Sequence, residues 1–387
     1  MIRKVLFWMH LAAGVSAGLV ILVMSATGVL LTYERQMTEW ADGYRVAPPA
    51  PDAPRLGVEA LVARVREARG ASPSSITLRA DPAAPAAFAL GREGTLFVDP
   101  YTGAPLGEGS KRARAFFHSV TDWHRWLGAQ GDARPVGKGV TGASNLLFLF
   151  IVLSGIVLWW PRGASVKHIA PITLFQRGLR GKARDFNWHN VFGFWSALPL
   201  AFVVASAVVI SYPWANDLAQ RLAGSEPPPR AASPRGPAGP PPAEPSLEGL
   251  DRAWATAEAE VAGWQSLTLR VPASSDAPWS FSIDTSTGAR RPSTRSQLVV
   301  DRRTGEVVRH ELYAGQPPGR KVVGWLRFIH TGEAFGLVGQ TIAGLASLGG
   351  VMLTWTGVAL ALRRFAAWRQ RRARAREAAA PEGATTA

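Results

Sequence analysis

The stretch "FNWHNVFGFW", residues 186–195, places a histidine at the start of an apolar run that continues to Val209. A helix of roughly 20 apolar residues covers a hydrocarbon core about 30 Å thick, because each residue rises about 1.5 Å. Three other blocks of the 387-residue chain have a similar length and composition. The sequence therefore predicts four transmembrane helices, at residues 5–33, 139–160, 187–212 and 333–362.

Lysine and arginine are concentrated in the short segments that flank these helices, namely Arg3 and Lys4, residues 161–186 and residues 363–387. Positive charge in short loops marks the cytoplasmic side, so both termini are expected there, in a multi-pass protein of the bacterial inner membrane. The net charge of +15 raises the possibility of nucleic acid as a partner. Since the arginine-rich tail directly follows a membrane helix, contact with anionic lipid of the bilayer explains it better, and no nucleic-acid partner is expected.

The two segments expected outside the membrane, residues 34–138 and 213–328, each predict a small α+β module. Each contains a helix-like stretch followed by segments that alternate apolar and polar residues, as half-buried strands do. The turns "VDPYTG" at Val98 and "VDRRTG" at Val300 repeat between them. The proline-rich residues 224–245 predict a disordered linker, which leaves residues 246–315 as the second module. The expected fold class is thus a four-helix membrane protein with two periplasmic α+β modules.

Three of the predicted membrane helices share a serine or threonine beside a glycine, in "SATGVLL", "VLSGIVLWW" and "TWTGVAL". Small residues let a neighbouring helix, or a flat ligand, approach the backbone closely. Helix packing alone explains such motifs better than ligand binding does.

The seven histidines are not scattered at random with respect to these helices. With the orientation above, His10 and His189 lie near the cytoplasmic ends of the first and third helices, and so share one depth. His124 and His330 precede the second and fourth helices and share the opposite depth. His168 falls in the basic cytoplasmic loop and His310 in a predicted strand, and both are interpreted as surface residues.

Ionisable residues at membrane helices are costly and are candidates for function. Two imidazoles from different helices can hold one haem iron, and this needs no cysteine, which the chain lacks. We therefore expect two bis-histidine b-type haems, one held by His10 and His189 and the other by His124 and His330. Hydrogen bonds from interfacial histidines to carbonyls or headgroups are the alternative. His118 in "FFHSVTDWHRW" competes with His124, which is favoured because Arg125 can pair with a haem propionate.

Motifs of several other enzyme classes are absent from the sequence. It contains no HExxH zinc site, Walker loop or dinucleotide fingerprint. Hydrolytic and nucleotide-dependent chemistry is accordingly not expected, and no catalytic side chain is identified.

Taken together, "WHRWLG", "LSGIVLWWPR", "NWHNVFGFW", "IHTGEAFGLVGQ" and the two VDxxTG turns resemble the PepSY-associated transmembrane family of bacterial inner-membrane proteins. The resemblance implies periplasmic PepSY-type domains, with haem ligands at His10, His124, His189 and His330. It also implies a ferrisiderophore reductase that carries electrons from a cytoplasmic or quinol donor to a periplasmic ferric chelate. The block "MHLAAGV" departs from the family pattern because no arginine follows its histidine. The alternative is a non-redox, membrane-anchored binding or regulatory protein.

Overall fold

The computed structural model describes residues 1–91, 94–160, 166–227, 229, 246–272, 274 and 276–378. Most of the predicted linker at 224–245, and the side chain of His168, lie outside the described part of the chain.

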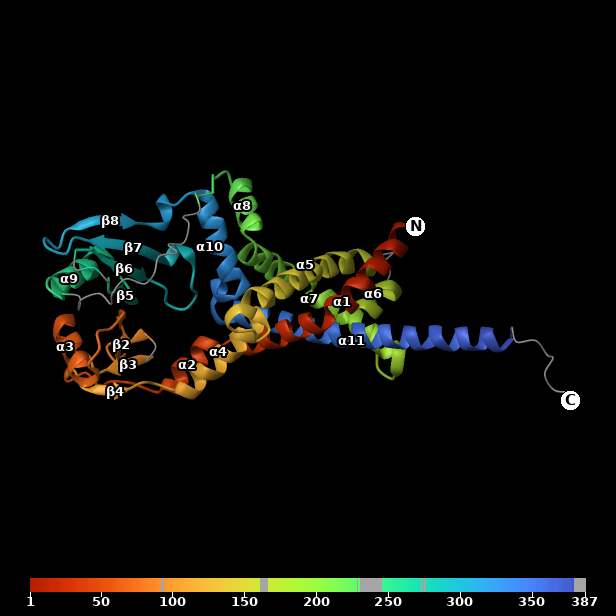
Figure 1. The fold of residues 1–387 in the computed structure, drawn as a ribbon, viewed down its shortest axis with the longest axis horizontal. Helices are drawn as coiled ribbons and strands as arrows, with labels where there is room; N and C mark the ends of the chain where they lie inside the picture. Colours follow the sequence, from red (N-terminus) through yellow and green to blue (C-terminus); the bar gives the residue numbers. More distant parts are fainter. Residues whose placement is uncertain are drawn as a thin grey trace.

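A bundle of four long helices forms one end of the molecule (Figure 1). Within the described residues, four helices are long and apolar enough to cross a membrane. Their outward faces expose large apolar side chains, such as Leu19 at 76 % and Leu198 at 68 %, which suits contact with lipid. The chain is thus a multi-pass membrane protein with four candidate spans. The bundle helices are α1 (Ile2–Leu31), α5 (Arg134–Trp159), α7 (Gly181–Ser211) and α11 (Gly336–Ala378).

Small residues bring α11 close to its two neighbours. A Cβ atom placed on Gly350 would lie 2.7 Å from the hydroxyl of Ser25 on α1, and one on Gly349 would lie 2.7 Å from the Cβ of Ser196 on α7. Glycine is therefore required at both contacts, as close packing of membrane helices predicts.

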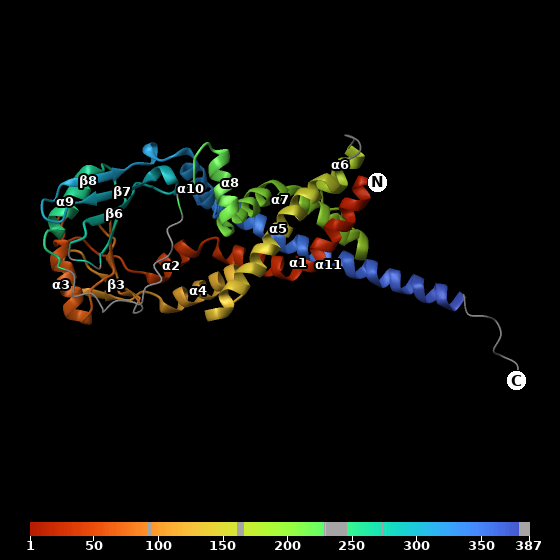
Figure 2. The same ribbon diagram turned by 45° about the horizontal axis from the view of Figure 1, so that its top comes forward.

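Four shorter helices lie between the bundle and the β-sheet (Figure 2). His124 and His330 precede the second and fourth spans on separate helices. The helix of His124 stops where Leu127 adopts a φ of 55°, and His330 is the last residue of its helix. The four shorter helices are α2 (Glu34–Asp42), α4 (Lys111–Trp126), α8 (Pro213–Leu222) and α10 (Pro318–His330), of which α4 carries His124 and α10 carries His330.

The two predicted α+β modules share one antiparallel sheet of eight strands, in the order β4-β3-β2-β1-β5-β6-β7-β8. The modules join where β1 pairs with β5. The first contributes β1 (Ser75–Arg79), β2 (Ala86–Ala89), β3 (Thr95–Val98) and β4 (Pro105–Gly107). The second contributes β5 (Ser266–Arg270), β6 (Trp279–Asp284), β7 (Arg295–Val300) and β8 (Val307–Glu311).

Helices α3 (Val58–Arg69) and α9 (Leu250–Glu260) cover one face of this sheet and bury its core. They lie at the end of the molecule farthest from the bundle (Figure 1). The repeated turns form as predicted: Asp99 and Asp301 each accept two backbone amide hydrogen bonds, and Gly103 and Gly305 both have a φ of 75°.

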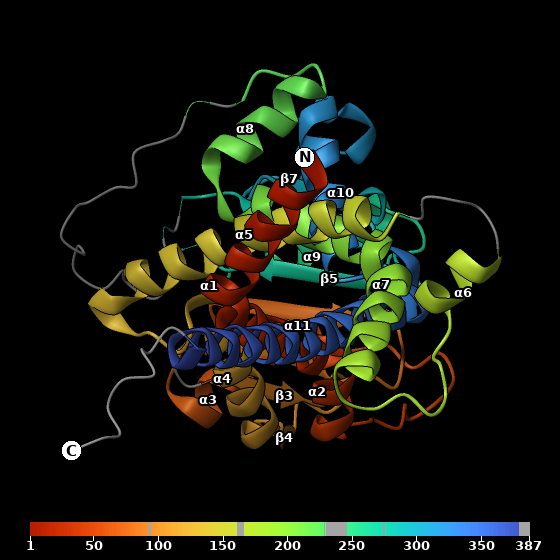
Figure 3. The same cartoon turned by 90° about the vertical axis from the view of Figure 1, so that its right-hand side faces the viewer.

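The end of the bundle opposite the sheet carries both chain termini (Figure 1). There the short helix α6 (Val166–Thr173) packs beside α7, and α11 continues beyond the other helices. The predicted basic tail is therefore helical as far as Ala378. Figure 3 views the bundle from this end.

Candidate functional site

His124 of α4 and His330 of α10 face each other at the sheet end of the bundle. Their ring centroids are 6.5 Å apart, with 56° between the ring planes. Two imidazoles that bind one metal ion from opposite sides have centroids roughly 6 Å apart, because each metal–nitrogen bond is about 2 Å long. The spacing therefore suits one shared metal ion between the rings.

Both of these rings are held through Nδ1. The Nδ1 of His124 lies 2.9 Å from the Thr27 hydroxyl of α1. The Nδ1 of His330 lies 2.9 Å from the Val203 carbonyl of α7 and 3.3 Å from the Ser206 hydroxyl. In each case the partner belongs to a different helix, so the bundle fixes the orientation of the ring.

The other two predicted ligands are held in the same way, at the opposite end of the bundle. The Nδ1 of His10 on α1 lies 2.9 Å from the Ser154 hydroxyl of α5. The Nδ1 of His189 on α7 lies 2.9 Å from the Thr356 hydroxyl of α11. His10 also lies close enough to His189 to interact with it electrostatically.

The hydrogen-bond network favours the same tautomer in all four imidazoles. Thr27, Ser154 and Thr356 each donate their hydroxyl proton to a carbonyl of their own helix, so the oxygen is left to accept from Nδ1–H. The Val203 carbonyl can only accept, so the Nδ1 of His330 must also donate. Each Nε2 consequently carries a lone pair, which is the form of imidazole that binds a metal.

The glycine beside each hydroxyl lies next to the same ring. A Cβ atom on Gly28, Gly155 or Gly357 would lie 3.6, 3.6 or 3.5 Å from the Cε1 of His124, His10 or His189, respectively, which is ordinary van der Waals contact. The Ser/Thr–Gly motifs therefore receive imidazoles: the hydroxyl lies within hydrogen-bond distance of Nδ1, and the ring packs beside the glycine.

The two histidine sites are separated along the bundle by a regular spacing. Thr27 follows His10 by seventeen residues on α1, and Ser206 follows His189 by seventeen residues on α7. At the usual helical rise this is about 26 Å. Helices α1 and α7 thus each supply a histidine to one site and a hydrogen-bond partner to the other.

The chemistry of the donor set fits haem better than a bare metal ion. No group of three or more His, Cys, Asp or Glu side chains able to hold a metal occurs in the described parts of the chain. Two neutral imidazoles suffice as axial ligands when a porphyrin supplies the other four donors.

The remaining candidate side chains lie elsewhere. His118 is on the exposed side of α4, with Nδ1 3.5 Å from Asp122, and not beside His330. The guanidinium of Arg125 lies over the Trp126 ring, 4.8 Å from its centroid. The Nδ1 of His310, on β8, is 3.2 Å from Glu260.

The "NWHN" motif around His189 is explained by its hydrogen bonds. The Asn187 side chain donates to the carbonyls of Pro171 and Leu174 and accepts from the amide of Gln176, so it ties the segment after α6 to α7. This contact holds the helix on which His189 lies.

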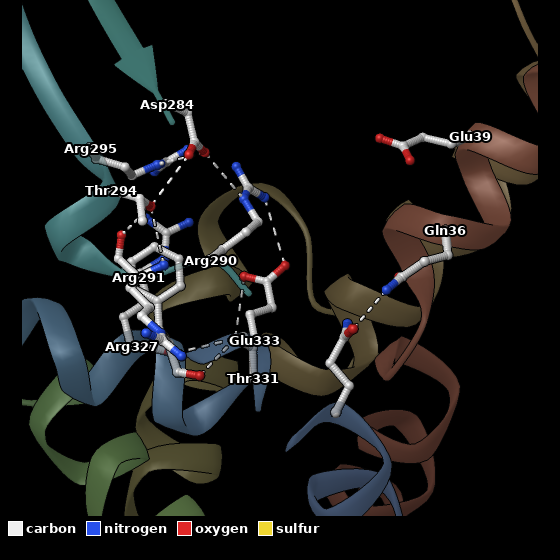
Figure 4. A network of polar contacts seen from close by, with 12 residues as sticks. Gln36, Glu39, Asp284, Arg290, Arg291, Thr294, Arg295, Arg327, Thr331 and Glu333 are labelled. Atoms are coloured by element: carbon white, nitrogen blue, oxygen red, sulfur yellow. Dashed lines mark hydrogen bonds and ion pairs between the residues drawn. The ribbon is translucent and has the colours of Figure 1, made fainter. Parts of the chain in front are cut away.

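A network of charged residues, which the sequence did not reveal, joins the sheet to the start of α11 (Figure 4). Asp284 lies 3.6 Å from Arg290 and 3.5 Å from Arg295, and Arg290 lies 3.7 Å from Glu333. Burial raises the pKa of Glu34 on the neighbouring α2, and the Glu333 carboxylate raises it further. The sheet is thereby anchored to the bundle close to the His124–His330 pair.

Comparison with known families identifies the chain. Residues 7–364 match the model of the PepSY-associated TM region, so the protein belongs to that family. No match was found among curated proteins.

Proposed function

We propose that this protein holds two b-type haems and passes electrons across the bacterial inner membrane to a ferric chelate, as a ferrisiderophore reductase. The observation that carries the proposal is the state of the four imidazoles. All four hold Nδ1 within hydrogen-bond distance of an acceptor on a neighbouring helix, which favours a lone pair at Nε2 for a metal, and they lie in two groups about 26 Å apart.

In this proposal His124 and His330 would hold the outer haem, and His10 and His189 the inner haem. Each haem, when bound, supplies a one-electron ferric/ferrous couple. The Ser/Thr hydroxyls and the Val203 carbonyl orient the imidazoles, and burial in an apolar interior favours their neutral form. His118 is not needed, because it is exposed on α4 and bonded to Asp122.

The residues between the two sites keep water out. Ile21 lies between His10 and Thr27 on α1, and Leu200 lies between His189 and Ser206 on α7; both are 2 % exposed. They belong to an apolar cluster that also contains Phe148, Val152 and Val204. Such a dry interior favours apolar macrocycles and discourages passage of ions.

The direction of transfer follows from the charges flanking the helices. Lysine and arginine gather at the end that carries the N-terminus and the end of α11, which supports a cytoplasmic position for that end and a periplasmic one for the β-sheet. A cytoplasmic or quinol donor supplies the electron, and the acceptor is a ferric siderophore or a similar chelate outside. Reduction to ferrous iron weakens its binding to oxygen-rich chelators, and so the iron is released.

The proposal is tested by single-turnover reduction in lipid nanodiscs. Purified protein is reduced with limiting dithionite and mixed with a ferric trihydroxamate. The α absorption band of the reduced haem reports reoxidation, and ferrozine captures the Fe(II) that is formed. We expect reoxidation with one Fe(II) formed per electron in the wild type and in His118→Ala, and loss of reoxidation in His330→Ala. A protein purified colourless from haem-replete cells, or reduced haem that a ferric chelate leaves unchanged, would contradict the proposal and favour a non-redox binding protein.

A further inference from the structure

Two strands at the centre of the sheet carry the same short sequence pattern. β1 reads "SITLR" (Ser75–Arg79) and β5 reads "SLTLR" (Ser266–Arg270). They pair antiparallel, with Ser75 opposite Arg270 and Arg79 opposite Ser266. The repeat is therefore arranged with approximate twofold symmetry about the junction of the two modules.

The serine, threonine and arginine side chains of both copies lie on the face that α3 and α9 do not cover. Leu78 and Leu269 belong to the core beneath those helices, and side chains alternate along a strand. The hydroxyls of Thr77 and Thr268 lie 2.9 Å apart, which places them on one face. Since α3 and α9 lie at the far end of the molecule, this face is turned toward the bundle (Figure 2).

Polar side chains continue across the next two strands of the same face. Ser280 is paired with Arg270, and Ser282 with Thr268. The Gln297 side chain of β7 donates to the Ser282 hydroxyl at 3.1 Å. We call the eight residues Ser75, Thr77, Arg79, Ser266, Thr268, Arg270, Ser280 and Ser282 the hydroxyl face.

The uncompensated charge on this side of the sheet is positive. Its two strand carboxylates are both ion paired, Asp284 with Arg290 and Arg295, and Glu311 with Arg320. Arg79 is paired with Glu39 of α2. Arg270 is exposed and has no ion-pair or hydrogen-bond partner among the residues that the structure describes.

We propose that the hydroxyl face binds the ferric chelate, and that the preferred chelate is anionic and rich in oxygen; this inference rests on the proposed function. Hydroxyls donate to chelator oxygens, and a guanidinium binds carboxylate in a bidentate manner. Arg270 supplies the guanidinium left unpaired among the described residues, at one end of the paired strands, whereas Arg79, about 14 Å away at the usual strand rise, is held by Glu39.

The position of this face supports the same role. Asp284 ends β6 on the hydroxyl-face side, and its network reaches Glu333, three residues from His330. A chelate on the hydroxyl face thus lies between the sheet and the helices α4 and α10, which carry the outer histidine pair (Figure 2).

Binding is tested with redox-inert gallium complexes, so that it is measured independently of electron transfer. Isothermal titration uses the full-length protein in nanodiscs with gallium citrate as the anionic probe and a cationic gallium trihydroxamate as the comparison. We expect wild-type protein to prefer the anion. Arg270→Gln and Thr268→Val should each weaken its binding at least fivefold, and added salt should weaken it in the wild type because the arginine is exposed.

The matched control is Arg303→Gln, which removes one exposed positive charge from the turn between β7 and β8 and should leave binding within twofold of wild type. Equal binding by Arg270→Gln and wild type, a preference for the cationic probe, or no binding of either probe overturns the inference. Gallium binding by a protein without haem would overturn the proposed function and leave the hydroxyl face intact, so the two failures are distinguishable.

Discussion

Replacing Thr356 by valine removes one hydrogen-bond acceptor from the inner site and almost nothing else. Valine has nearly the same shape, and Thr356 is 1 % exposed, so the packing of α11 against α7 is retained. The Nδ1–H of His189 then loses its acceptor at 2.9 Å. A buried donor left without a partner costs about 1–3 kcal/mol. Since about 1.4 kcal/mol corresponds to a factor of ten, haem at this site should be retained roughly five- to hundredfold less well.

The assay is transfer of haem from the protein to an excess of apomyoglobin, followed by the Soret band, together with a redox titration of each site. Only the inner haem should be affected, because the outer site is about 26 Å away and shares no partner with Thr356. Thr354→Val is the matched control, because its hydroxyl donates only to the Gly350 carbonyl of its own helix. Equal haem retention in Thr356→Val and wild type, or equal losses in the two variants, would refute the role assigned to this hydroxyl.

Three further predictions concern other parts of the molecule. Gly155→Ala should keep the inner haem, because the added Cβ would lie 3.6 Å from the Cε1 of His10. Gly155→Leu should displace the His10 ring and lower the haem content by about one per chain, as measured by the pyridine haemochrome assay. His118→Ala should leave the haem content and spectrum unchanged, and loss of a haem there would show that the outer ligand is misassigned. Burial raises the pKa of Asp284, but hydrogen bonds from Ser286 and the charges of Arg295 and Arg290 outweigh it and lower the pKa overall. The ionised Asp284 carboxylate therefore contributes its full stabilisation above the unfolded pKa of about 4, and this stabilisation is lost as pH falls through the lower folded pKa. The melting temperature of Asp284→Asn should accordingly depend less on pH between about 5 and about 2 than that of the wild type.

The helices and strands could be predicted from the sequence because their signals are local. Four long apolar runs identify the candidate spans, and alternation identifies strands such as "SITLR". The pairing of β1 with β5 could not be predicted from local pattern, because it joins residues nearly two hundred positions apart. The repeated S-x-T-x-R pattern was the available signal, and it becomes informative only once the two strands are known to be neighbours.

The candidate site was only partly visible in the sequence. The four histidines could be chosen by depth, and the Ser/Thr–Gly motifs could be singled out as places where a flat ligand can approach a helix. The hydrogen bonds from Nδ1 could not be foreseen, because a serine or threonine in a membrane helix equally often bonds only its own backbone. The interval of seventeen residues from His10 to Thr27, repeated from His189 to Ser206, is a signal that could have linked each histidine to the opposite site.

The most direct measurement is the haem-to-protein ratio of purified wild-type protein and of the four variants His10→Ala, His124→Ala, His189→Ala and His330→Ala. The account predicts two haems in the wild type and one in each variant, with His10→Ala and His189→Ala losing the same spectral component and His124→Ala and His330→Ala losing the other. A wild-type protein without haem, or variants whose ratio and spectrum equal those of the wild type, would contradict it.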